Sequence, residues 1–121
     1  MESMGQNQNE NRIDYIELPV TGMASTKQFY GAVFGWTFED YGPDYTSFCD
    51  GRLAGGFTQQ RPAPALGLLL VIYSSDLTTM QKKITDAGGT IVKETFSFPG
   101  GRRFHFTDPS GNELAVWSDV P

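Results

Sequence analysis

Hydrophobic and polar residues alternate along several short stretches of this chain, which is the pattern of strands with one buried face. In Ile13–Val20, every second residue from Ile16 onward is apolar, while Tyr15 and Glu17 belong to the opposite face. We predict the first strand here, with its apolar face toward a core.

The predicted final strand, Glu113–Ser118, has a more unusual second face. It follows the sequence "DPSGN", whose Pro and Gly suit a tight turn. Leu114 and Val116 form one apolar face of this strand. The other face combines a carboxylate, a small residue and a large aromatic ring: Glu113, Ala115 and Trp117. We expect such a mixture to line a site.

Two segments have apolar residues at helical spacing instead. Ser25–Phe34 has Ser25 or Thr26 as its predicted N-cap and Gly35 closing it, and a second helix is predicted over Leu77–Ala87. The further strands are predicted in "GWTFEDYG", "YTSFCDG" and "RLAGGFTQ", and at Leu68–Tyr73, Thr90–Phe96 and Arg102–Thr107. The order strand, helix, three strands therefore occurs twice.

This repetition predicts an α+β fold of two βαβββ modules in tandem, which form a curved mixed sheet around a cleft. Residues 1–12 lack apolar periodicity and are predicted to be a disordered tail. Residues 13–118 form a single domain with module one at 13–58, a proline-containing connector at 59–65 and module two at 66–118. Each helix covers one face of its sheet, so the other face is left for the cleft.

Composition excludes several classes of function. The net charge is −5 and the basic residues are scattered, so nucleic acid is not expected as a partner. The longest apolar run is far shorter than the roughly 20 residues that cross a bilayer, so no membrane association is expected. Cys49 is the single cysteine and is read as a small buried residue. With no leader-like segment at the start, this predicts a cytoplasmic protein.

The duplicated unit, with "KQFYGAVFGW" after the first strand, "ITDAGG" closing the second helix and "FTDPSGNELAVW" at the end, resembles the vicinal oxygen chelate superfamily. This superfamily includes glyoxalase I, bleomycin-resistance proteins and extradiol dioxygenases. The resemblance implies four strand positions at which metal-using members place ligands. Counted from the motifs, they fall on Tyr15, Gly55, Leu69 and Ala115. Three of these residues have no side-chain donor atom and a neutral phenol is a poor ligand, so we expect no metal and no other cofactor.

The candidate ligand-binding residues are those expected to face the cleft. The polar candidates are Glu17, Arg103, His105 and Glu113, and the aromatic ones are Tyr15, Phe57 and Trp117, with Tyr45 and Trp36 as neighbours. Gly55, Leu69 and Ala115 complete the set, with the small residues leaving a hollow. The alternative interpretation is that the glutamates only form ion pairs with Arg52, Arg102 or Arg103, and that the aromatic residues fill a core.

These residues support two functions of different classes. The first is metal-free binding of a small, partly aromatic or apolar organic molecule. The second is a lyase or isomerase resembling glyoxalase I, in which Glu17, Glu113 or His105 is the catalytic candidate, with no metal or with one displaced onto those three side chains. A purely structural module is a third possibility. We also expect a homodimer, because the edge strands need cover.

Overall fold

The computed structural model describes residues 8–121, and its elements follow the predicted order. Module one contains five elements: β1 (Tyr15–Pro19), α2 (Met23–Phe34), β2 (Thr37–Asp40), β3 (Tyr45–Cys49) and β4 (Ala54–Thr58). Module two repeats them: β5 (Leu70–Tyr73), α3 (Leu77–Asp86), β6 (Thr90–Phe98), β7 (Gly101–Thr107) and β8 (Glu113–Ser118). The predicted fold class, two βαβββ modules, is confirmed.

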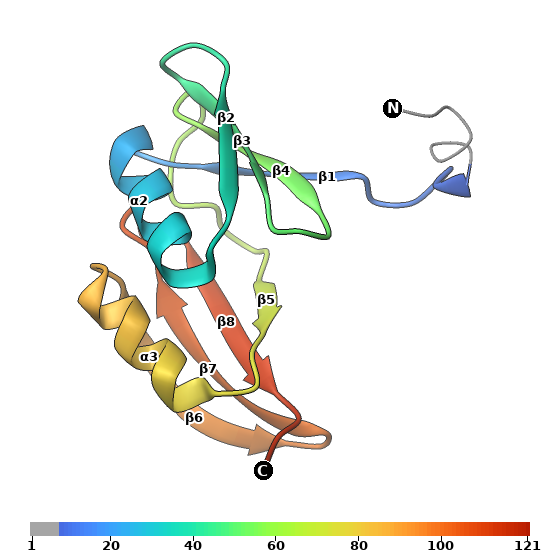
Figure 1. The fold of residues 1–121 in the computed structure, drawn as a ribbon, viewed down its shortest axis with the longest axis vertical. Helices are drawn as coiled ribbons and strands as arrows, with labels where there is room; N and C mark the ends of the chain where they lie inside the picture. The colour runs from blue at the N-terminus through green and yellow to red at the C-terminus, as the bar shows by residue number, and fades with distance from the viewer. Residues whose placement is uncertain (1–7) are drawn as a thin grey trace.

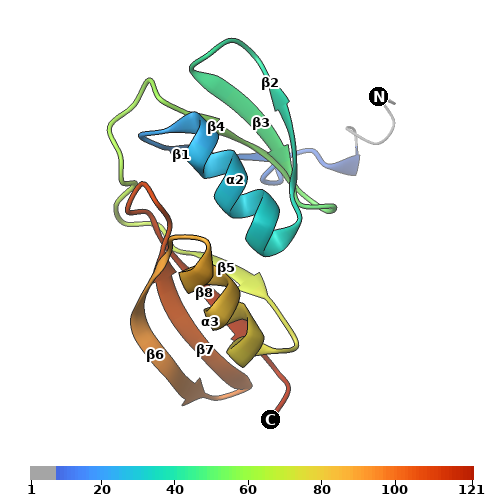
Figure 2. The ribbon, with the colours of Figure 1, turned by 60° about the vertical axis from the view of Figure 1, so that its left-hand side comes forward.

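Each module forms its own four-stranded mixed sheet. The strand order is β1-β4-β3-β2 in the first sheet and β5-β8-β7-β6 in the second (Figure 1). In both sheets the edge strand that precedes the helix pairs in parallel with the last strand of the module, and the other pairs are antiparallel. The two helices lie on the same side of the molecule, each over one face of its sheet (Figure 2). We call the opposite face of each sheet its open face.

Only the C-terminal end of α2 was predicted correctly. The helix begins at Met23 after Gly22, so the prediction of Ser25 or Thr26 as N-cap is wrong. Both hydroxyls instead donate to the carbonyl of Gly22 within the first turn, at 3.1 Å and 2.6 Å. At the other end Gly35 has φ of +73°, which confirms it as the residue that closes the helix.

Aromatic rings fill the core between α2 and the first sheet. Phe57 is fully buried, and its ring stacks on those of Phe48 and Tyr30 at centroid distances of 4.7 Å and 5.1 Å. Trp36 stacks on Tyr30 and Phe48 in the same way. In module two, Phe104 and Phe106 face the helix layer together with Leu114 and Val116.

The turn before β8 joins the two modules through buried polar groups. The Tyr30 hydroxyl donates to Asp108 Oδ2 at 2.8 Å, across 78 positions of sequence. Burial, and then the Asp108 carboxylate, raise the pKa of Tyr30 well above its ordinary value. Asn112 Nδ2 donates to the carbonyl of Pro19, and Asn112 Oδ1 accepts from the amide of Ala65. These bonds fix module one, the connector and module two to one another.

Within residues 8–121, no helix is long and apolar enough to span a lipid bilayer. The predicted tail lies partly outside the described residues, and residues 8–12 are exposed.

Candidate functional site

The open face of the first sheet presents a pair of tyrosines. Tyr15 on β1 and Tyr45 on β3 place their hydroxyl oxygens 2.6 Å apart. Burial, followed by the hydrogen bond with Tyr15 and the nearby Glu17 carboxylate, raises the pKa of Tyr45 well above its ordinary value, so this phenol keeps its proton. Tyr15 is 43% exposed, so one side of the pair is accessible.

A glycine of β4 makes the tyrosine pair possible. A Cβ atom at Gly56 would lie within 3.0 Å of the hydroxyls of both Tyr15 and Tyr45, closer than real Cβ atoms approach. The absent side chain lets both phenols lie across the strand. Sequence reasoning missed Gly56, which the register of β1 and β4 pairs with Glu17 and so places on the open face.

Two predicted members of this face point the other way. A Cβ atom at Gly55 would meet the Phe48 ring, which belongs to the helix side, and Phe57 is buried in the same aromatic core. The prediction that Gly55 and Phe57 face the site is therefore wrong. Consecutive glycines carry no side chain that reveals which face is apolar, so counting through them shifted the assignment by one residue.

Glu17 lies on the open face but has a partner in the connector. The Arg61 guanidinium contacts its carboxylate at 3.1 Å, and both side chains are partly exposed. Sequence reasoning missed Arg61 and named Arg52, Arg102 or Arg103 as the partners. An exposed ion pair of this kind contributes about 0–1 kcal/mol, so it positions Glu17 more than it stabilises the fold.

The open face of the second sheet holds an imidazole oriented by a carboxylate. His105 Nδ1 lies 2.8 Å from Glu113 Oε2, across the antiparallel pair of β7 and β8. The His105 side chain is 10% exposed, and its Nε2 atom is buried without a hydrogen-bond partner among residues 8–121. Both residues line a pocket of about 330 Å³, which the segment Pro64–Leu69 bounds on another side. Leu69 is thus brought to the predicted site.

Trp117 lies further along the same face. Its ring meets Tyr73 of β5 edge-on at a centroid distance of 5.3 Å, and both line a second pocket of about 690 Å³ together with Trp36 and Arg52. Arg103 pairs with Trp117 in the β7–β8 register, and its guanidinium lies over the rings of Phe96 and Phe98. Tyr73 was not predicted, although strand alternation in β5 would have placed it here.

Ala115 does not line a hollow. It lies between His105 and Val71 in the strand register and is 0% exposed, so the expectation of open space beside it is wrong. The prediction that Cys49 is buried is also wrong, because this residue is exposed.

The residues present do not fit a metal ion of the kind that the resemblance implies. On the corrected strand face, Gly56 takes the place of Gly55 among the four family positions. Like Leu69 and Ala115, it has no side-chain donor atom. Within residues 8–121, no three His, Cys, Asp or Glu side chains lie close enough together to hold an ion. A displaced site formed by Glu17, His105 and Glu113 is thus not assembled within one chain, because Glu17 belongs to the first sheet and the other two to the second.

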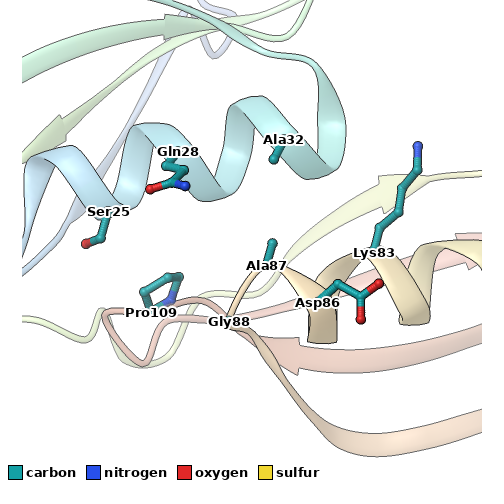
Figure 3. A pocket seen from close by; sticks show the side chains of 8 residues that line it. All are labelled: Ser25, Gln28, Ala32, Lys83, Asp86, Ala87, Gly88 and Pro109. Atoms are coloured by element: carbon teal, nitrogen blue, oxygen red, sulfur yellow. The ribbon is translucent and has the colours of Figure 1, made fainter.

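A different groove lies between the helices (Figure 3). It has a volume of about 540 Å³ and contains none of the predicted site residues. Its lining is formed by Ser25, Gln28, Ala32, Lys83, Asp86, Ala87, Gly88 and Pro109. These side chains come from α2, the end of α3 and the turn before β8, on the side away from both open faces.

Comparison with known proteins agrees with this architecture. The sequence profile of the Glyoxalase/Bleomycin resistance protein/Dioxygenase superfamily matches residues 12–116. The chain belongs to this superfamily. The crystal structure of a glyoxalase/bleomycin resistance protein/dioxygenase family enzyme from Burkholderia phytofirmans superimposes with a TM-score of 0.77 at 16% identity, covering 89% of this chain and all of that one. TioX from Micromonospora superimposes with a TM-score of 0.69 at 18% identity, covering 88% of this chain and 98% of TioX.

The curated relatives that this chain matches are longer proteins. The putative glyoxylase CFP32 of Mycobacterium tuberculosis is 24% identical over 115 residues, which cover 86% of this chain and 44% of CFP32. The anthracycline biosynthesis protein DauV of Streptomyces is 29% identical over 125 residues, covering 85% of this chain and 45% of DauV. The chain therefore spans less than half the length of these relatives.

Proposed function

We propose that this protein binds a small, partly aromatic or apolar organic molecule on its open sheet faces without a metal ion. The observation that supports this most is the composition of those faces, where half-exposed aromatic rings stand beside polar groups already held by hydrogen bonds. Tyr15 and Tyr73 are 43% and 50% exposed, and the pocket beside His105 has a volume of about 330 Å³. A larger pocket of about 690 Å³ extends from Tyr73 and Trp117 to the end of α2 in module one. These volumes match those of ordinary small-molecule sites.

The guest contacts follow from the geometry. Tyr15, Tyr73 and Trp117 supply ring surface, and Leu69 supplies apolar contact. Glu17, Arg103, His105 and Glu113 supply the polar contacts. A titration monitored by the fluorescence of Trp117 and Trp36 tests this with a panel of flat aromatic and apolar metabolites. A panel that leaves the spectrum unchanged contradicts the proposal.

Elemental analysis tests separately whether the protein is free of metal. Protein purified without added metal should contain far less than one equivalent of Zn, Ni, Fe or Mn per chain, because the four family positions supply a single phenol. Elemental analysis that finds a stoichiometric ion would contradict this.

We also propose that the protein acts as a homodimer in the cytoplasm. Apolar side chains remain exposed just before β1, just after the connector and in β5, notably Ile13 at 82%, Leu66 at 88% and Val71 at 44%. Covering them with a second copy would bury apolar surface and enclose the open faces. Sedimentation at micromolar concentration should give a dimer. A monomer at that concentration refutes the homodimer proposal.

One observation favours a second function, a lyase or isomerase resembling glyoxalase I. An imidazole held by a carboxylate, as His105 is by Glu113, is a common arrangement for a general base. This makes His105 and Glu113 better catalytic candidates than Glu17, which Arg61 engages. A glyoxalase assay with added divalent ions and after chelation decides between the two, since turnover in either condition favours the enzyme.

A further inference from the structure

A strip of aromatic rings crosses the open face of the second sheet and ends at a cation. Tyr73 and Trp117 meet at a centroid distance of 5.3 Å, and Trp117 lies 6.5 Å from Phe98 of β6. The Arg103 guanidinium lies over Phe98 and over the neighbouring ring of Phe96, at 5.8 Å and 5.5 Å from their centroids. Contact with two rings holds this guanidinium in one place on the face.

The donating end of Arg103 has no partner in the protein. Within residues 8–121 its side chain forms no hydrogen bond and no ion pair, and of its three nitrogen atoms only Nε is enclosed. Arg103 is only half-buried, yet a cation that is partly removed from water is normally paired with an anion or with several acceptors. The two Nη atoms therefore form a fixed fork of donors that is open to a guest.

A second cation lies beside the first. The Lys93 ammonium is 4.4 Å from the centroid of Phe96, the ring that Arg103 also contacts, so the two charges are at most about 10 Å apart, one Debye length at 0.1 M salt. Lys93 likewise forms no ion pair among the described residues. Glu113 lies on this face, but its carboxylate contacts His105 at 2.8 Å. In a chain with 14 acidic and 9 basic side chains, two neighbouring cations without a counter-charge are a local feature that composition does not explain.

We infer that the guest of this face carries an oxyanion, a carboxylate or a phosphate, which Arg103 binds through its two Nη atoms. The planar guanidinium fork matches both groups, and Lys93 adds attraction as a point charge. Trp117 pairs with Arg103 in the β7–β8 register, so an aromatic framework that lies on Trp117 and Tyr73 has its anionic group beside Arg103. This inference rests on the proposed binding function and narrows it to aromatic acids or phosphate esters.

Three probes with one framework test the inference: 2-naphthoate, 2-naphthyl phosphate and the neutral 2-naphthamide. Calorimetry at about pH 7.5, where a carboxylic acid is ionised, should show at least one anion binding about ten-fold tighter than the amide, because hydrogen bonds between charged groups are the stronger kind. The anion that binds tighter identifies the group. Raising the salt from about 50 mM to about 500 mM should weaken binding of the anion and change binding of the amide little.

Variants of two adjacent arginines show whether Arg103 is the receptor. Arg103→Gln should remove most of the preference for the anion and change the affinity for 2-naphthamide little, which also shows that the variant is folded. Arg102→Gln is the matched control, because Arg102 belongs to the opposite face of β7 by strand alternation and donates to the Val120 carbonyl at 3.4 Å. This control removes the same charge and should keep the preference. Arg103→Lys retains the charge without the fork and should keep only part of it.

The failures of the two claims are distinct. Equal affinities for the amide and both anions, or an undiminished preference in Arg103→Gln, overturn the inference and leave the binding function standing. An equal loss in Arg102→Gln and Arg103→Gln overturns it as well, because only the net charge of the protein would then matter. Binding of none of the three probes counts against the binding function itself, and against oxyanion recognition with it.

Discussion

Two adjacent glycines of β4 allow a sharp test of the site, because the structure places them on opposite faces. At Gly55, an added Cβ would lie within 3.0 Å of the Ile16 carbonyl oxygen on β1 and of the Phe48 ring. A backbone oxygen in a sheet cannot move aside without separating the two strands. At Gly56, the Cβ would meet the far ends of Tyr15 and Tyr45 instead.

The expected magnitudes differ accordingly. Gly55→Ala overpacks the core and should cost about 1–3 kcal/mol, which for a domain of this size lowers Tm by roughly 4–12 °C. Gly56→Ala displaces mobile side-chain ends and loses a hydrogen bond of about 0.5–1.5 kcal/mol. The lower entropy of the unfolded alanine chain returns about 0.4–1 kcal/mol, so Tm should change by only a few degrees.

Thermal melts and an alkaline tyrosine titration make up the assay. Gly55→Ala should lower Tm while the remaining folded protein keeps the raised pKa of Tyr45. Gly56→Ala should melt near the wild type, with the pKa of Tyr45 moved back toward its ordinary value because the phenol loses its burial and its Tyr15 partner. If Gly56→Ala melts lower than Gly55→Ala, the assignment of the two faces is wrong.

Two further predictions concern the second sheet and the contact between the modules. Ala115→Phe should destabilise the protein by about 1–3 kcal/mol in a denaturant titration, because Ala115 is fully buried, and an unchanged midpoint would show a hollow there after all. The raised pKa of Tyr30 means that the folded chain keeps a proton which the unfolded chain loses above about pH 10. Unfolding free energy should therefore be unaffected by this group below pH 10 and fall as the pH rises beyond it, more steeply in the wild type than in Tyr30→Phe. Equal slopes in urea titrations of the two proteins would contradict this cause.

Much of the fold was evident in the sequence, because periodicity is a local property. The alternation in Glu113–Ser118 correctly placed Leu114 and Val116 against the helix layer and Glu113 on the open face. The two helices and the strands of both modules were found near their observed positions for the same reason. At Gly55 and Gly56 no side chain shows which face of the strand is apolar, so the two faces of β4 were assigned the wrong way round.

The remaining features depend on residues that are distant in sequence. The bond between Tyr30 and Asp108 and the meeting of Tyr15 with Tyr45 join segments 78 and 30 positions apart, and no local period encodes them. The burial of Ala115 likewise depends on the neighbouring strands and the side chains around them. The sequence by itself determined the two modules and which residues could face a site. The tertiary structure decided which of them meet, because pairing between strands and packing of the modules bring these side chains within bonding distance.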